Sequence, residues 1–194
     1  MAIRPIPDDE LPKGDLWVFG YGSLMWRPGF DYLAECPARL IGEHRALCVF
    51  SHHHRGTAEK PGLVLGLDRG GTCQGTAFRV AEAARAATLE YLREREQISG
   101  VYHEVLRSVW LENDARERVQ ALAFVVDRNH RQYAGVLTLE QQLRYVANSR
   151  GISGPNRDYV IETVKALDAR GCHDPALRRL VALLQSEIPL QEAE

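Results

Sequence analysis

The fold turns on one stretch of the sequence, Trp17-Val18-Phe19-Gly20-Tyr21-Gly22-Ser23-Leu24. It begins as an apolar run of strand-forming residues and stops on two alternating glycines, which predicts a strand at residues 17–21 that ends in a tight turn. Glycine has no Cβ, so the backbone N–H groups of such a turn can approach a ligand closely. Successive backbone donors of this kind suit a carboxylate or a developing oxyanion.

A plainer interpretation of the same stretch stays open. An ordinary glycine-rich turn after an N-terminal strand has the same pattern, and two glycines spaced by one residue are a weak signal. The dinucleotide-binding fingerprint does not fit, because the third glycine and the following helical pattern are missing.

The composition is that of an ordinary globular protein. Of the 194 residues, 45% are hydrophobic and 26% are charged, which is typical of globular proteins. The length is typical of one compact domain. The net charge of −2 argues against a general nucleic-acid or anionic-membrane binder. We expect a flexible N-terminal tail at residues 1–15, where prolines block regular structure, and a single domain at residues 16–190.

The lack of a recognisable targeting signal and the spacing of the cysteines favour a location in the reducing cytoplasm. The first residues are proline-rich and acidic, unlike a signal or transit peptide, and no apolar run is long enough to cross a bilayer. The four cysteines are Cys36, Cys48, Cys73 and Cys172. They form no Cys-x-x-Cys pair, so we expect neither a zinc site nor a disulfide framework.

The order of elements predicts an α+β fold. Short apolar runs predict strands at residues 17–21, 45–50, 63–67, 72–80, 102–111 and 118–126, with hairpin turns at residues 68–71 and 112–114. Helical patterns cover residues 81–97, 138–149, 156–170 and 174–187. We expect an irregular connection at residues 24–39 and a mobile polar loop at residues 52–62. Successive hairpins favour a small antiparallel or mixed β-barrel with helices outside it.

One carboxylate in the first helix stands out by its position. Leu89 and Leu92 mark the buried stripe, and Glu96 follows at helical spacing on the same face, whereas Glu90 and Glu94 fall on the solvent side. A carboxylate at the end of an apolar stripe is partly desolvated. We therefore expect the pKa of Glu96 to be raised, which suits a general acid/base.

Another interpretation of Glu96 also stays open. The residue lies at the end of its helix, so it could face water or pair with Arg93 and Arg95. Tyr133, which leads from the last strand into the helical third, is either a core residue or part of a pocket wall.

The triplet His52-His53-His54 is weak evidence for a metal site. Consecutive side chains in an extended segment alternate in direction, so the three cannot converge on one ion. No carboxylate or cysteine accompanies them at ligand spacing, and a polar loop is the better interpretation. Serine-hydrolase and cysteine-protease signatures are missing.

Several ordered blocks resemble the ChaC-type γ-glutamylcyclotransferases. The blocks are Val18 to Trp26 with Pro28-Gly29-Phe30, His54 to Gly62, Tyr91-Leu92 with Arg95-Glu96, Tyr133-Ala134-Gly135, and Ser153 to Tyr159. The similarity runs from about residue 16 to about residue 185. It implies the small cyclotransferase barrel with helices and a cytoplasmic enzyme acting on glutathione.

The resemblance also implies roles for particular residues. Glu96 would be the catalytic acid/base, in preference to Glu94, because the leucine stripe favours it. The substrate-binding residues would be Val18, Phe19, Gly20, Tyr21, Gly22, Ser23, Leu24 and Tyr133. No cofactor, metal, nucleic acid or membrane is implied, and the partner is a small-molecule substrate. Two alternatives are a cyclotransferase for other γ-glutamyl amines or peptides, and a non-catalytic regulatory protein linked to cation transport.

Overall fold

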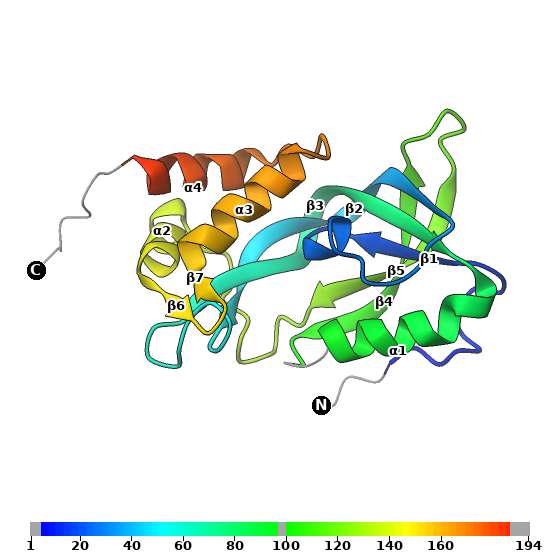
Figure 1. Ribbon diagram of the computed structural model, residues 1–194, viewed down its shortest axis with the longest axis horizontal. Helices are drawn as coiled ribbons and strands as arrows, with labels where there is room; N and C mark the ends of the chain where they lie inside the picture. Colours follow the sequence, from blue (N-terminus) through cyan, green and yellow to red (C-terminus); the bar gives the residue numbers. More distant parts are fainter. Residues whose placement is uncertain (1–4, 97–99, 187–194) are drawn as a thin grey trace, which may run out of the picture. The chain divides into compact units, whose positions relative to one another are not determined.

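Strands of the described chain close into a barrel. The computed structural model describes residues 5–96 and 100–186. Within them the barrel order is β1-β3-β2-β4-β5 (Figure 1). The strands are β1 (Leu16–Gly20), β2 (Ala34–Ser51), β3 (Gly62–Val80), β4 (Tyr102–Leu111) and β5 (Arg118–Val126). β1 pairs antiparallel with β3 and parallel with β5, which closes the barrel and confirms the mixed α+β architecture.

The predicted hairpin at residues 68–71 is wrong. β3 runs through this segment without reversing, although Gly70 and Gly71 have φ angles of +100° and +73°. The two glycines supply a local irregularity that any other residue would adopt with strain. β3 lies between β1 and β2 in the barrel order, and hydrogen bonding to a strand on each side outweighs the local turn preference.

The predicted irregular connection at residues 24–39 is also wrong in its second half. β2 begins at Ala34 and includes Pro37. A proline cannot donate to a ladder, but its carbonyl still accepts. The Pro37 carbonyl accepts a hydrogen bond from the Glu112 backbone N–H at 2.7 Å. In contrast, β4, β5 and the turn between them match the prediction.

Helix α1 (Arg85–Glu96) packs beside the barrel, after a short 3₁₀ turn, η2 (Glu82–Ala84). Its buried residues Leu89 and Leu92 join one apolar cluster with side chains of the barrel and of the N-terminal segment. The other buried members are Leu11, Leu16, Val18, Leu24, Phe78, Val80, Leu122 and Phe124. The prediction of a helix here is confirmed, and its predicted last residue, Gln97, lies outside the described residues.

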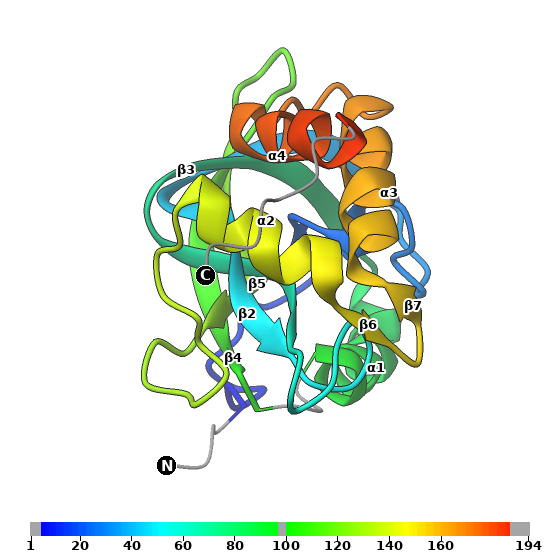
Figure 2. The ribbon, with the colours of Figure 1, turned by 90° about the vertical axis from the view of Figure 1, so that its left-hand side faces the viewer.

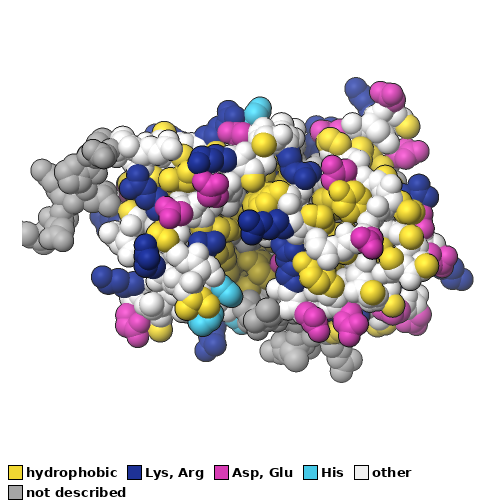
Figure 3. All heavy atoms as spheres, viewed as in Figure 1, with side chains coloured by type: hydrophobic (Ala, Val, Ile, Leu, Met, Phe, Trp, Pro, Cys, Tyr) yellow, Lys and Arg dark blue, Asp and Glu magenta, His cyan; other side chains and the backbone are white. Residues whose placement is uncertain are grey.

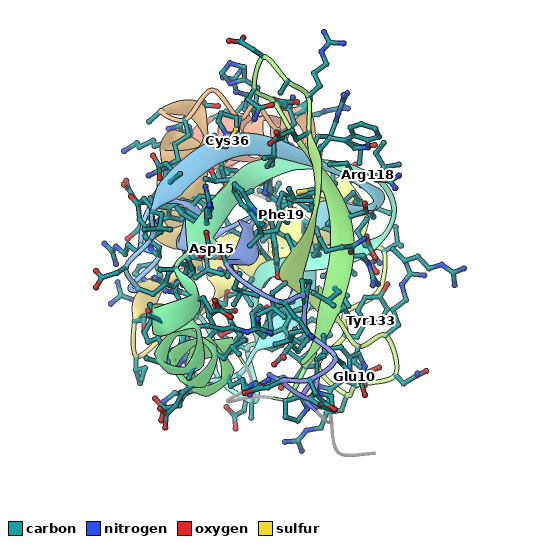
Figure 4. The ribbon with its side chains drawn as sticks, turned by 90° about the vertical axis from the view of Figure 1, so that its right-hand side faces the viewer. Glu10, Asp15, Phe19, Cys36, Arg118 and Tyr133 are labelled. Carbon is teal, nitrogen blue, oxygen red and sulfur yellow. The ribbon has the colours of Figure 1, made fainter. Side chains whose placement is uncertain are left out.

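Phe19 fills the middle of the ring of strands (Figure 4). Its side chain is fully buried, and Gly75 on β3 lies against its ring. A Cβ at Gly75 would stand 2.7 Å from the Phe19 ring and would also meet the Gly20 carbonyl. The absence of a side chain at Gly75 therefore lets β1 and β3 approach closely where β1 ends.

Contacts divide the chain into two compact units. The first comprises Met1–Val49 and Leu65–Gly135, and the second comprises Phe50–Val64 and Val136–Glu194. All the residues proposed from the sequence for catalysis or substrate binding belong to the first unit. The expectation of one domain at residues 16–190, preceded by a flexible tail, stays a prediction.

The second unit is mainly helical (Figure 2). It contains α2 (Leu139–Asn148), β6 (Arg150–Gly151), β7 (Gly154–Pro155), α3 (Asn156–Asp168) and α4 (Pro175–Gln185), and the three helices pack against one another. Thr138 caps α2 in a capping box with Gln141, and Asp174 caps α4. These caps confirm the predicted starts of both helices. The predicted end of the last helix, Glu187, lies outside the described residues.

The polar loop at residues 52–62, whose mobility stays a prediction, makes hydrogen bonds to residues far along the chain. The N–H groups of Ile152 and Ser153 donate to the carbonyls of His53 and His54 at 3.0 Å each. At the far end of the loop the buried side chain of Asn156 donates to the Leu63 carbonyl at 2.8 Å, and accepts from the Leu63 N–H at 2.7 Å. The polar loop thus makes long-range contacts that its composition does not reveal.

Basic and acidic side chains are interspersed on the face of the molecule shown in Figure 3. This mixture agrees with the small net charge of −2. Among the described helices, none is both long enough and apolar enough to cross a membrane.

We predict that the buried ion pair between Arg93 and Glu104 stabilises the first unit. The Glu104 side chain is 0% exposed and lies 2.9 Å from Arg93 Nε, and it also accepts from the Ile6 N–H at 3.2 Å. Arg93→Ala leaves this carboxylate buried without its cation, which costs about 3–5 kcal/mol. Urea denaturation measures the loss.

The matched control is Lys165→Ala, which breaks the Lys165–Glu162 pair. Those side chains are 66% and 68% exposed, so this variant is expected to lose little stability. Equal losses in the two variants would contradict the prediction.

Candidate active site

The glycine-containing stretch ends β1 and turns at once into a 3₁₀ turn, η1 (Ser23–Met25). The Met25 N–H donates to the Gly22 carbonyl at 2.9 Å. A Cβ at Gly20 would lie 3.2 Å from Leu24 Cβ and 3.3 Å from the Met25 nitrogen. A side chain at Gly20 would therefore be tight against the returning chain, and the φ angle of Gly20 is not left-handed.

Arg45, on β2, holds this turn from the barrel side. Its Nε donates to the Tyr21 carbonyl, and its Nη2 donates to the Gln74 carbonyl at 2.6 Å. In a trans peptide the C=O and the following N–H point in opposite directions. By fixing the Tyr21 carbonyl, Arg45 therefore directs the Gly22 N–H to the opposite side of the turn.

Most side chains of the stretch point into apolar surroundings. Val18 and Leu24 belong to the cluster beneath α1, Phe19 is fully buried, and Tyr21 is also buried. A Cβ at Gly22 would lie 3.4 Å from Leu65. Ser23, by contrast, is exposed. Within this stretch, a ligand would therefore meet the Ser23 hydroxyl and backbone groups rather than apolar side chains.

Glu96 is the last residue of α1, and its side chain is only 18% exposed. Leu89 and Leu92 are fully buried on the same face, whereas Glu90 and Glu94 are exposed. The prediction from helical spacing is confirmed for all three carboxylates.

Burial also raises the pKa of Glu96 above its ordinary value of 4.5, although the nearby Arg95 guanidinium opposes this effect. Desolvation disfavours the charged carboxylate more than the cation favours it. The expected upward shift of the pKa is confirmed. A carboxyl group with a raised pKa is a stronger base when ionised and is suited to exchange protons near neutral pH.

Arg95 connects the carboxylate of Glu96 to the turn. Its Nε lies 3.1 Å from Glu96 Oε1, and its Nη2 donates to the Ser23 hydroxyl oxygen at 2.9 Å. Its Nη1 donates to the Arg27 carbonyl at 2.6 Å. One guanidinium therefore contacts both the candidate acid/base and the candidate binding turn.

Tyr133 belongs to a different cluster. Its hydroxyl donates to Asp68 Oδ2 at 2.9 Å, and the Arg128 guanidinium lies over its ring at 5.8 Å from the centroid. Burial and the Asp68 carboxylate raise the pKa of Tyr133 to about 12. The phenol is thus neutral and engaged with β3, and these contacts do not include the turn or Glu96.

Sequence reasoning missed the roles of Arg45 and Arg95. The sequence indicates Arg95 only as a partner that would make Glu96 an ordinary surface acid, and Arg45 only as the first residue of an expected strand. The adjacency of Arg95 to Glu96 was the one available signal. No pattern marks Arg45, because its partners lie 24 and 29 residues away.

Two of the family-like blocks meet in the second unit. Arg55 donates to the Ser153 carbonyl, and its guanidinium lies over the Tyr159 ring at 5.1 Å from the centroid. His54 Nδ1 lies 3.0 Å from the Ser153 hydroxyl. Among the described residues, no group of three or more His, Cys, Asp or Glu residues is arranged to hold a metal ion.

Comparisons with known proteins agree on one family. The family model described as ChaC-like protein matches residues 16–187. The chain is 34% identical over 183 residues to the glutathione-specific gamma-glutamylcyclotransferase of Escherichia coli, covering 93% of this chain and 75% of that protein. It is 32% identical over 173 residues to the protein of the same name from Schizosaccharomyces pombe, covering 80% and 84%.

The fold is also found in a solved structure. The crystal structure of a gamma-glutamyl cyclotransferase specific to glutathione from yeast superposes with a TM-score of 0.78, at 21% identity, over 89% of this chain and 96% of that one. A family match over most of the sequence, together with a shared barrel, leads to one conclusion: the chain belongs to the ChaC-like protein family.

Proposed function

We propose that this protein is a γ-glutamylcyclotransferase that cleaves glutathione to 5-oxoproline and cysteinylglycine. The observation that carries the proposal is the partly buried carboxylate of Glu96, which a guanidinium connects to the turn at the end of β1. The relatives that bear the name glutathione-specific gamma-glutamylcyclotransferase support the substrate.

The reaction is an intramolecular amide exchange. The α-amine of the γ-glutamyl unit attacks its own γ-carbonyl carbon, so a C–N bond forms and closes a five-membered ring. The C–N bond to the cysteinyl nitrogen breaks. One proton leaves the attacking amine and one proton reaches the departing nitrogen, so atoms and charge balance without oxidant, reductant or water.

Glu96 serves as the acid/base that moves this proton. Its carboxylate accepts the proton from the attacking amine and then donates it to the departing nitrogen. A raised pKa favours both halves of this exchange, because the group is neither too weak a base to accept the proton nor too weak an acid to return it.

The turn at Gly20 to Leu24 binds the γ-glutamyl head group. Negative charge develops on the γ-carbonyl oxygen as the ring closes, and fixed backbone N–H groups stabilise such charge. Arg45 supports this role because it sets the direction of the Gly22 N–H. Holding the flexible glutamyl chain in a folded form adds an orientation effect.

The remaining assignments follow from the sequence. Val18, Phe19 and Leu24 remain proposed substrate-binding residues from the resemblance, although their side chains are buried. Tyr133 remains a proposed substrate-binding residue, and its hydroxyl is engaged with Asp68. A cytoplasmic location and a preference for a small molecule over nucleic acid remain predictions.

The first test is Glu96→Gln, which keeps the shape of the side chain and removes its proton exchange. We expect turnover of glutathione to 5-oxoproline to fall by about 10²–10⁴-fold, while glutathione still binds in calorimetric titration. Glu94→Gln, at an exposed position of the same helix, is the matched control and is expected to retain full turnover.

Two outcomes would count against the assignment. Near-normal turnover in Glu96→Gln, or a large loss in Glu94→Gln instead, would move the acid/base role away from Glu96. Turnover of other γ-glutamyl amines or peptides in preference to glutathione would change the substrate while leaving the chemistry in place.

The second test is the pH dependence of kcat/KM. Glu96 must be ionised to accept the amine proton, so activity falls as the pH drops through its pKa. Because burial raises that pKa above 4.5, the acid limb is expected above the position of an ordinary glutamate. A profile that stays flat down to pH values below that position contradicts the role.

A further inference from the structure

Arg95 makes contacts that a solvated arginine at the end of a helix does not need. Its side chain is 22% exposed. Besides Glu96, Ser23 and the Arg27 carbonyl, it donates from Nη1 to the Tyr91 hydroxyl at 2.9 Å. A cation in the last turn of a helix is already favoured by the helix dipole. That effect alone does not require bonds to a separate turn of the chain.

Its neighbour Arg93 shows the structural alternative on the same helix. Arg93 pairs with the fully buried Glu104 of β4 and donates to the Ile6 carbonyl at 2.9 Å. Those two partners also contact each other, because the Ile6 N–H donates to Glu104, so Arg93 helps to hold the N-terminal segment against β4. The partners of Arg95 instead include both elements to which the proposed reaction assigns a role.

The local backbone is shaped to accept this arginine and its support. Gly29 has a φ of +76°, and a Cβ there would collide with the Tyr91 hydroxyl. Tyr91 also packs edge-on against Phe30, with ring centroids 6.4 Å apart. The segment after η1 is thereby pressed against α1, which brings the Arg27 carbonyl and the Ser23 hydroxyl within reach of Arg95.

We propose that Arg95 is a positioning residue, which holds the Glu96 carboxylate in a fixed place relative to the turn that binds the γ-glutamyl group. This inference rests on the proposed function. A planar guanidinium fork suits the task, because its N–H groups point in set directions and reach several acceptors at once.

Arg95 acts on Glu96 through orientation and through charge. The fork restricts the rotation of the carboxylate, and the positive charge favours its ionised form. The guanidinium also contacts the Ser23 hydroxyl and the backbone carbonyl of Arg27, and neither group carries a formal charge. Arg95 is therefore the cation that offsets the burial of Glu96. Removing the cation raises the pKa of Glu96 further.

The Ser23 hydroxyl is set by the same contact. Its oxygen accepts from Arg95, and a hydroxyl that accepts one hydrogen bond can still donate its own hydrogen. The Ser23 hydroxyl therefore keeps its own hydrogen available to a ligand at the turn.

The test compares Arg95→Gln, Arg95→Lys and the control Arg85→Gln in the full chain. Arg95→Gln is expected to lower kcat about 10²-fold, the loss that a misplaced catalytic group produces, and to move the acid limb of kcat/KM to higher pH. Arg95→Lys keeps the charge but loses the fork, so kcat falls while the limb stays near that of the wild type. Arg85 starts the same helix and donates to the Pro12 carbonyl, so its variant is expected to keep wild-type values.

Carbon-13 NMR titration of the Glu96 carboxyl supplies a readout independent of turnover. The pKa of Glu96 is expected to be higher in Arg95→Gln than in the wild type and unchanged in Arg85→Gln. An unchanged pKa together with wild-type kcat in Arg95→Gln overturns the inference. A loss of kcat that only follows a loss of folded protein in thermal melts, with the Glu96 pKa unmoved in the folded fraction, overturns it as well.

Glu96→Gln, measured alongside, separates the two proposals. If Glu96→Gln is inactive and Arg95→Gln behaves as the wild type, the positioning role fails and the proposed function stands. If Glu96→Gln turns over glutathione normally, the proposed function fails, whatever the NMR titration shows of the Arg95–Glu96 coupling.

Discussion

The contact between Glu96 and Arg95 is the interaction on which the candidate site depends. A carboxylate taken out of water at the end of α1 is unfavourable unless a cation or hydrogen-bond donors accompany it. Arg95 supplies both, yet burial remains the larger effect and the pKa of Glu96 is still raised. The protein therefore keeps a carboxyl group that is more basic than an ordinary glutamate and that is held by a guanidinium. Both properties suit a group that must exchange a proton with a bound substrate.

The turn at the end of β1 is held from two sides. Arg45 fixes the Tyr21 carbonyl from β2, and Arg95 contacts Ser23 and the Arg27 carbonyl from α1. The apolar cluster that contains Val18, Leu24 and the leucines of α1 anchors both elements to the barrel. A site supported by rigid elements of this kind needs little rearrangement when charge develops on a ligand.

Arginines two residues apart on one helix serve different ends because their surroundings differ. Arg93 neutralises the charge of Glu104, a residue of β4 whose side chain is completely buried, and so contributes to the stability of the fold. Arg95 lies where α1 meets the turn and compensates a carboxylate that is only partly enclosed. The same side-chain type is structural in one place and is proposed to position a catalytic group in the other.

Local patterns predicted the elements whose stability is largely local. The spacing of Leu89, Leu92 and Glu96 indicated α1 and its buried face, and Thr138 and Asp174 marked helix starts that the structure confirms. The same kind of reasoning failed at residues 68–71. Two glycines there mimic a hairpin, but pairing on both edges keeps β3 extended. Strand length is decided by neighbouring strands, which the local sequence does not contain.

The sequence by itself placed Glu96 on the same helical face as Leu89 and Leu92, because an α-helix has a period of 3.6 residues. That the side chain is in fact largely buried came from the structure. The sequence also predicted a turn after the first strand, because an apolar run of strand-forming residues stops there on two glycines. Only the tertiary structure decided that Arg95 joins these two features, that Arg45 orients the turn, and that Tyr133 lies with Asp68. Those contacts join residues separated by 24 to 72 positions, and such pairings depend on how the barrel closes rather than on any local preference.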